Sequence, residues 1–107
     1  MRILHVLDHS IPLHSGYTFR TLAILREQRR LGWQTLQLTT PKQGAGTARE
    51  ETVDGLRLFR TPSAPGTGLL AQMRLTAARI AEVVDAERPD LIHAHSPVLN
   101  ALPALWV

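Results

Sequence analysis

The feature that most constrains the fold is an alternation of short apolar runs with longer amphipathic segments. Residues 2–7 (Arg-Ile-Leu-His-Val-Leu) form a short apolar run with β-branched members, which is typical of a buried parallel strand. Residues 15–31 follow a helical period and stop at Gly32, as helices commonly do. Residues 33–40 form a second strand-like run, which Pro41 ends. A strand, a helix and a strand in this order predict a βαβ unit with a right-handed crossover.

The middle of the chain continues this alternation. Residues 42–52 are polar and contain two glycines, so we expect a loop there. Residues 53–56 (Val-Asp-Gly-Leu) predict a hairpin turn that leads into a strand over 56–60. Residues 69–88 predict the second long helix, which Pro89 stops. The predicted buried stripe of this helix consists of Leu70, Met73, Ala77, Ile80 and Val84.

The last part of the chain predicts a further strand over 90–95 and a third helix, opened by a Ser96 cap with Pro97 at its first position. That helix runs into an apolar end, residues 101–107, so we expect the natural protein to continue and the isolated chain to self-associate. The expected fold class is α/β, a Rossmann-like open parallel sheet with helices on both faces. Residues 1–107 would form one incomplete domain.

Composition narrows the function. The chain of 107 residues suits one domain, and because it has no cysteine, disulfides and thiolate metal sites are excluded. The net charge is +3, but with two Trp, one Tyr and two Phe the chain lacks the aromatic-rich basic cluster of a nucleic-acid groove. We therefore expect no nucleic-acid partner. No apolar run is long enough to span a membrane and no signal peptide is recognisable, so we expect a cytoplasmic protein.

The loop after the first strand is the first candidate site. In an open parallel sheet, ligands bind at the carboxyl ends of the strands, where this loop lies. The following helix begins near Ser15 and Gly16, and a helix N-terminus offers free N–H groups to a phosphate. The loop matches neither a dinucleotide-binding fingerprint nor a P-loop, and a purely structural role for Gly16 is as good an interpretation.

The second candidate is the pair His93 and His95, which share one face of a strand and end it. A metal is one interpretation, but no third ligand is evident, although His9 and His14 could approach, and we predict none. A packed, hydrogen-bonded histidine is the alternative for each of the pair. For His95 we favour contact with a ligand, through a neutral or a charged imidazole. His5 lies mid-strand and is interpreted as a core histidine.

These segments together resemble a known family. The opening residues 1–8, followed by a loop that ends at Ser15–Gly16, resemble the start of family 4 glycosyltransferases of the GT-B fold. Residues 88–97 (Arg-Pro-Asp-Leu-Ile-His-Ala-His-Ser-Pro) are similar to that family's Pro-Asp-hydrophobic-hydrophobic-His-x-His pattern. Residues 31–33 (Leu-Gly-Trp) also agree. The stretch 7–17 looks most like a bacterial subgroup tied to exosortase and exopolysaccharide loci.

The resemblance implies two Rossmann-like domains, of which this chain is part of the N-terminal, acceptor-binding one. The parent would move a sugar, with retention of configuration and without a metal or cofactor, from a nucleotide-sugar donor to a glycan or lipid-linked acceptor. By family position, the Gly16 backbone faces the donor diphosphate, His95 lies in the active site and His93 is a less constrained substrate-binding residue. Ser15 replaces the first of two usual glycines. The donor domain, with its Glu-x7-Glu motif, is absent, so the chain alone should be inactive.

Two other classes of function stay open. One is a free-standing module that binds a nucleotide or another phosphorylated ligand. The other is a domain that docks a partner protein or an anionic membrane through its arginine-bearing helices, which would place the protein at the periphery of the inner membrane. The alternative without a binding role is that those arginines simply lie on helix faces exposed to water.

Overall fold

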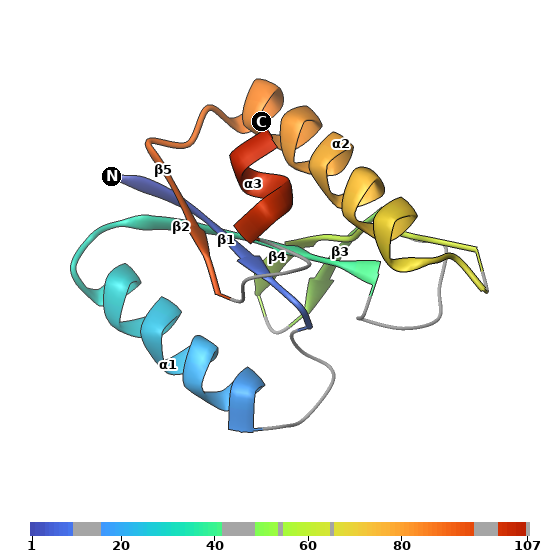
Figure 1. Ribbon diagram of the computed structural model, residues 1–107. Helices are drawn as coiled ribbons and strands as arrows, with labels where there is room; N and C mark the ends of the chain where they lie inside the picture. The colour runs from blue at the N-terminus through green and yellow to red at the C-terminus, as the bar shows by residue number, and fades with distance from the viewer. Residues whose placement is uncertain (10–15, 42–48, 54, 65, 96–100, 107) are drawn as a thin grey trace.

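A computed structural model describes residues 1–9, 16–41, 49–53, 55–64, 66–95 and 101–106, except for the Tyr17 side chain (Figure 1). The elements are β1 (Arg2–Leu7), α1 (Gly16–Arg30), β2 (Gln34–Thr39), β3 (Glu50–Val53), β4 (Leu56–Phe59), α2 (Leu69–Glu87), β5 (Leu91–Ala94) and α3 (Leu102–Trp106). The predicted strands and both long helices are confirmed to within about two residues at each end. The predicted cap of the third helix, Ser96–Pro97, lies outside the described residues.

The strands form one sheet in the order β3-β4-β2-β1-β5. β1 pairs in parallel with both β2 and β5, and β2 pairs in parallel with β4. α1 lies on one face of this sheet, whereas α2 and α3 lie on the other (Figure 1). The predicted fold class, a Rossmann-like open sheet with helices on both faces, is thereby confirmed.

β3 is the main departure from the expected architecture. The polar stretch 42–52 is predicted to be a loop, but its last residues begin an edge strand at Glu50, which pairs antiparallel with β4. Because an edge strand has one partner and can leave its side chains in water, it needs no apolar run, and Glu50 and Glu51 are both exposed. The predicted hairpin is confirmed, with Gly55 at φ 76° in its turn.

Alternation along β1 divides the core between the two faces of the sheet. Leu4 and Val6 face α2, where they join a cluster that includes Leu38 and Ile80. A smaller cluster lies under α1. It consists of Leu22 and Leu25 of the helix with Leu56 and Leu58 of β4. The odd-numbered residues of β1 therefore face α1, and this places the side chain of His5 beneath that helix.

The buried stripe of α2 differs in part from the prediction. Met73 and Ile80 are buried as expected, but Leu70 in the first turn is 55% exposed, and that part of the prediction is wrong. Thr76 is buried in addition, and its hydroxyl donates to the backbone carbonyl of Gln72. That hydrogen bond removes most of the cost of burying the hydroxyl.

Both long helices end as their sequences predict. Gly32 follows α1 with φ 89°, a left-handed conformation that glycine adopts without strain. α2 ends at Arg88 with φ 50°, directly before Pro89, which cannot continue a helix. None of the described helices combines the length and the apolar character that crossing a membrane requires.

Candidate functional site

The carboxyl edge of β1 and β5 is where a ligand is expected in this fold. From β1 the chain runs through β2 to β4 on one side and then returns to place β5 on the other side. Such a switch in strand order leaves a crevice at the carboxyl ends of the two strands. His95 directly follows β5 here, and its backbone N–H donates to the carbonyl of Val6 at 3.1 Å. The structure thus brings His95 to the predicted edge of the sheet.

Three histidines, which we call the histidine cluster, meet at this edge: His5, His93 and His95. His5 and His93 are register partners on neighbouring strands, so they share a face. The rings of His93 and His95 are stacked, with centroids 4.0 Å apart. Nδ1 of His5 lies 2.8 Å from Nε2 of His95, and Nε2 of His5 lies 2.8 Å from Oε1 of Gln28 on α1.

The three members differ in burial. His5 is only 1% exposed, which agrees with its interpretation as a core histidine, but its contacts with the other two histidines were not foreseen. His95 is partly buried, whereas His93 is exposed and is not a packed residue of the sheet. The sequence analysis found no evident third ligand and named only His9 and His14 as residues that could approach the pair. His14 lies outside the described residues, and the structure supplies His5 instead.

Gln28 is the functional candidate that the sequence analysis missed. It lies at a helical spacing from Leu22 and Leu25, on the stripe of α1 that faces the sheet. The available signal was a long polar side chain on the buried stripe of α1, because a half-buried amide needs a hydrogen-bond partner.

Electrostatics keep the partly buried members of the cluster neutral. Burial lowers the pKa of His95 to about 3, with further contributions from His93, His5 and Arg20 of α1. Burial also lowers the pKa of His5, against the opposing effect of its hydrogen bond to Gln28. At neutral pH, His95 therefore offers an uncharged imidazole to a ligand and not the cation that would attract a phosphate.

The ligand nitrogens of the histidine cluster lie within 4.8 Å of one another, so a metal must be considered. A bound Zn²⁺ needs imidazole lone pairs that point at it from about 2.0–2.1 Å, and those lone pairs lie in the ring planes. The planes of His93 and His95 are only 19° apart, so their lone pairs run side by side instead of converging. The observed arrangement favours a hydrogen-bonded cluster, and the absence of a metal stays a prediction.

Gly16 is the first residue of α1 and is exposed. Among the described residues, a Cβ at this position would meet nothing within 4 Å, so neither their atoms nor a positive φ requires glycine here. Close approach of a phosphate to this backbone stays a prediction. Ser15 lies outside the described residues.

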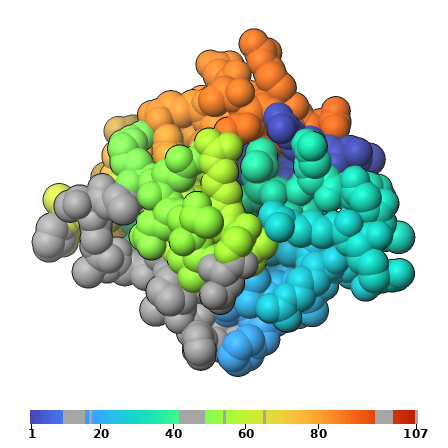
Figure 2. All heavy atoms as spheres, turned by 180° about the vertical axis from the view of Figure 1, so that it is seen from behind, coloured from blue at the N-terminus to red at the C-terminus, as the bar shows by residue number. Residues whose placement is uncertain are grey.

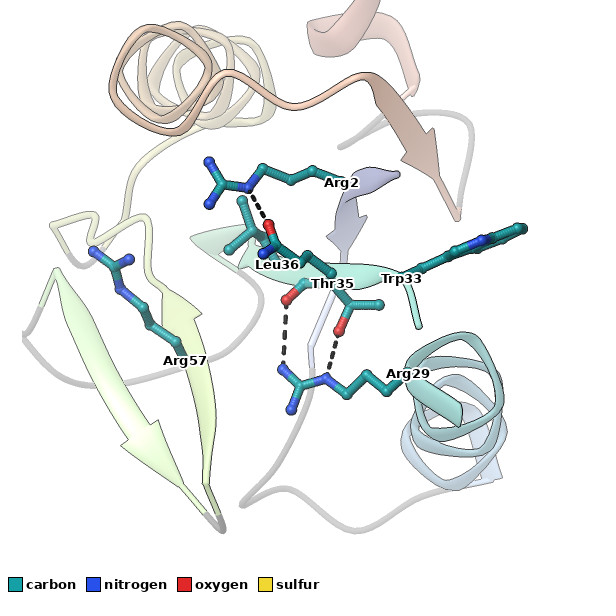
Figure 3. A pocket seen from close by; sticks show the side chains of 7 residues that line it. Arg2, Arg29, Trp33, Thr35, Leu36 and Arg57 are labelled. Carbon is teal, nitrogen blue, oxygen red and sulfur yellow. Dashed lines mark hydrogen bonds between the residues drawn. The ribbon is translucent and has the colours of Figure 1, made fainter. Parts of the chain in front are cut away.

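A pocket of about 380 Å³ lies at the opposite, amino-terminal edge of the sheet (Figure 3). Figure 2 shows this part of the molecule from behind, with β3 and β4 (green) beside the end of α1 and the start of β2 (teal). The end of α1 and the start of β2 supply most of the residues that line the pocket. It is lined by Arg2, Arg29, Trp33, Gln34, Thr35, Leu36 and Arg57.

The arginines of this pocket already have structural partners. Arg2 and Arg57 both pair with Glu87, at 3.8 and 2.7 Å, and Arg29 donates to the hydroxyl of Thr35 at 2.8 Å. Ligands of open parallel sheets bind at the other edge. We therefore place the candidate site at the histidine cluster and regard this pocket as part of the scaffold.

A comparison with protein families identifies the family of the chain. Residues 15–107 match the family described as glycosyl transferase 4-like domain. The chain belongs to this family. No curated protein and no solved structure matches the chain. The part that matches the glycosyl transferase 4-like domain contains Gly16, Gln28, His93 and His95, whereas β1 with His5 precedes it.

Acidification is expected to destabilise the fold through His95. Its pKa is about 3 in the folded chain, against 6.5 for an unperturbed histidine, so between these values the unfolded chain binds more protons. The free energy of unfolding should therefore fall as the pH drops from about 6.5 towards 3. Urea unfolding at about pH 7 and about pH 5 measures this. His95→Asn should lose less stability over that interval than the wild type, and equal losses would contradict the assignment.

His5 and His93 should differ sharply in their effect on stability. His5→Ala leaves a cavity and removes the partner of both Gln28 and His95, which should cost about 2–3 kcal/mol. His93→Ala removes an exposed ring and should cost less than about 0.5 kcal/mol. Chemical unfolding of the two variants tests this, and a larger loss for His93→Ala would mean that His93 is the packed member.

Proposed function

We propose that this chain is the acceptor-side domain of a retaining glycosyltransferase. The enzyme moves a sugar from a nucleotide-sugar donor to a glycan or lipid-linked acceptor in exopolysaccharide synthesis. Family membership supports the transferase class. The observation that carries the proposal is the position of His95 at the switch point of the sheet, beside the carboxyl ends of β1 and β5.

His95 contacts the acceptor or the reacting sugar. In a retaining transfer, the bond from the anomeric carbon to the diphosphate oxygen breaks, a bond to the acceptor oxygen forms on the same face, and the proton of the acceptor hydroxyl passes to the departing diphosphate. Positive charge develops on the sugar and negative charge on the departing diphosphate. A neutral imidazole suits a sugar hydroxyl, and the low pKa of His95 supports this role. His93, exposed beside it, contributes to substrate binding.

The diphosphate is assigned to the start of α1. Gly16 opens this helix of 15 residues, whose free N–H groups and dipole favour an anion, and none of the described residues fills the space beside Gly16. Ser15 precedes it in the chain. Arg20, one turn further along the helix, acts electrostatically on His95, which supports a common site for the phosphate and the sugar.

A second Rossmann-like domain supplies most of the donor site under this proposal, so the chain alone transfers no sugar. The reading frame that encodes the chain should then continue for roughly 250–300 residues, since the architecture needs a second domain. Leu105 and Trp106 of α3 are 80% and 52% exposed, which supports contact with a second copy of the chain or with the inner membrane.

The test is sugar transfer by the complete enzyme, with a panel of nucleotide-sugars and lipid-linked glycans, followed by NMR of the anomeric centre of the product. Retained configuration and no transfer by residues 1–107 alone are expected. An inverted product would contradict the retaining mechanism. Tight nucleotide binding by the chain alone, without transfer by any longer product of its gene, would favour the binding module.

A further inference from the structure

A chain of hydrogen bonds joins α1 to His95 along the face of the sheet that α1 covers. It runs from Gln28 through the buried ring of His5 to His95, with both steps 2.8 Å long. We call these three residues the histidine relay. His5 lies in the central part of β1, which is paired on both sides, so the middle member of the relay is rigidly held.

The relay has a direction that the chemistry of its groups fixes. Oε1 of Gln28 is a carbonyl oxygen and can only accept, so Nε2 of His5 carries the proton. Since burial keeps His5 neutral, its Nδ1 holds a lone pair and must accept the proton of Nε2 of His95. His95 is neutral as well, which leaves its own Nδ1 with a lone pair.

We propose that Gln28 and His5 are positioning residues that fix His95 as a hydrogen-bond acceptor at Nδ1, so that the group it meets is a sugar hydroxyl and not a phosphate oxygen. This inference rests on the proposed role of His95 in sugar transfer. It assigns two different ligand groups to this edge of the sheet. Nδ1 of His95 accepts a hydrogen bond from a sugar hydroxyl, while the N–H groups at the start of α1 bind the anion.

Three further observations support the relay. The hydrogen bond from His95 to His5 uses Nε2, and within the described part of the chain no residue hydrogen-bonds to Nδ1 of His95. The backbone N–H of His95 donates to the carbonyl of Val6, so the position of the His95 backbone does not depend on the relay. His93 and Arg20 add positive potential that opposes a second proton on His95. Outer partners that fix the tautomer of a working histidine are a recurrent device in proteins.

Nitrogen-15 NMR of the imidazole rings in the full chain tests the relay without any substrate. Protonated and lone-pair nitrogens have well-separated shifts. We expect the proton of His95 on Nε2 and a bare Nδ1. Gln28→Met keeps the length and helix propensity of the side chain but removes the acceptor, and should give His95 a mixture of tautomers. Gln28→Lys offers only donors and should move the population further towards a proton on Nδ1.

Gln72→Met is the matched control, because Gln72 lies on α2, where its side chain donates to the carbonyl of Thr67. Gln72→Met should leave the nitrogen-15 shifts of His5 and His95 unchanged. A proton found on Nδ1 of His95 in the wild type would overturn the relay. So would a His95 tautomer population that Gln28→Met leaves unchanged. If the Gln28 variants fail to fold, the wild-type spectrum still decides the direction.

Turnover of the complete enzyme separates the relay from the proposed function. Gln28→Met should lower kcat by about 10-fold with little change in the KM for the donor, since the imidazole stays in place and only its tautomer changes. A shifted tautomer with normal kcat would overturn the hydroxyl contact. Normal turnover of a His95 variant, with the expected spectra, would sink the proposed function and leave the relay as a structural element.

Discussion

Replacing His95 with alanine is expected to lower the turnover of the complete enzyme by roughly 10²–10³-fold, because a positioned polar contact in a transition state is worth about 3–4 kcal/mol. Under the proposed function, this contact belongs to the imidazole, which meets the reacting sugar or acceptor at the carboxyl edge of β1 and β5. The fold should survive, since the backbone bond of residue 95 to Val6 does not involve the side chain.

Steady-state kinetics and thermal melts of the same preparations measure this. His93→Ala is the matched control, because it removes the stacked neighbour of His95 and leaves the relay intact. Because we propose that His93 contributes to substrate binding, this variant should keep most of its kcat and show its effect as a higher KM. A His95→Ala enzyme with normal turnover, or one that loses activity only by unfolding, would refute the assignment and leave His95 as a packed histidine.

Ile80→Ala should be the most destabilising single change considered for this chain. Ile80 is 0% exposed and packs in the cluster between α2 and the sheet, so its truncation leaves a cavity. The expected loss in the free energy of unfolding is about 3 kcal/mol. For a chain of 107 residues this lowers the midpoint of thermal unfolding by roughly 10–20 °C.

Leu70→Ala is the control on the same helix, where the side chain is 55% exposed. It removes as many side-chain carbons and should cost less than about 0.5 kcal/mol. Urea unfolding of both variants makes the comparison. Equal losses would show that the first turn of α2 is packed in solution and that the arrangement described above is wrong.

The same two residues show what a sequence can and cannot predict. The helical period correctly placed Met73 and Ile80 on the buried face of α2, because a period is a property of the helix itself. It also placed Leu70 there, since the period does not tell how far along a helix the sheet continues to cover it. β3 escaped prediction for a related reason: an exposed edge strand needs no apolar pattern.

The candidate site was predictable to the same extent. The shared face and terminal position of His93 and His95 follow from strand alternation and from the proline and helix signals around them. The relay does not, because His5 and His95 are 90 positions apart and meet only through the register of β1 with β5. Register between distant strands is set by the assembled core, and it cannot be predicted from a single sequence.

The two edges of the sheet differ in how readily a further strand could pair with them. At the β3 edge, two exposed glutamates would oppose the approach of another strand, as charged edges do. At the other edge, among the described residues, β5 pairs only with β1 and carries exposed Leu91 and His93. Any strand that extends this sheet, from the same polypeptide or another one, is therefore directed to the side on which the histidines stand. Under the proposed function, a segment that adds to the sheet beside β5 lies next to the histidine cluster, so a change in that segment alters the surroundings of the acceptor and leaves the relay in place.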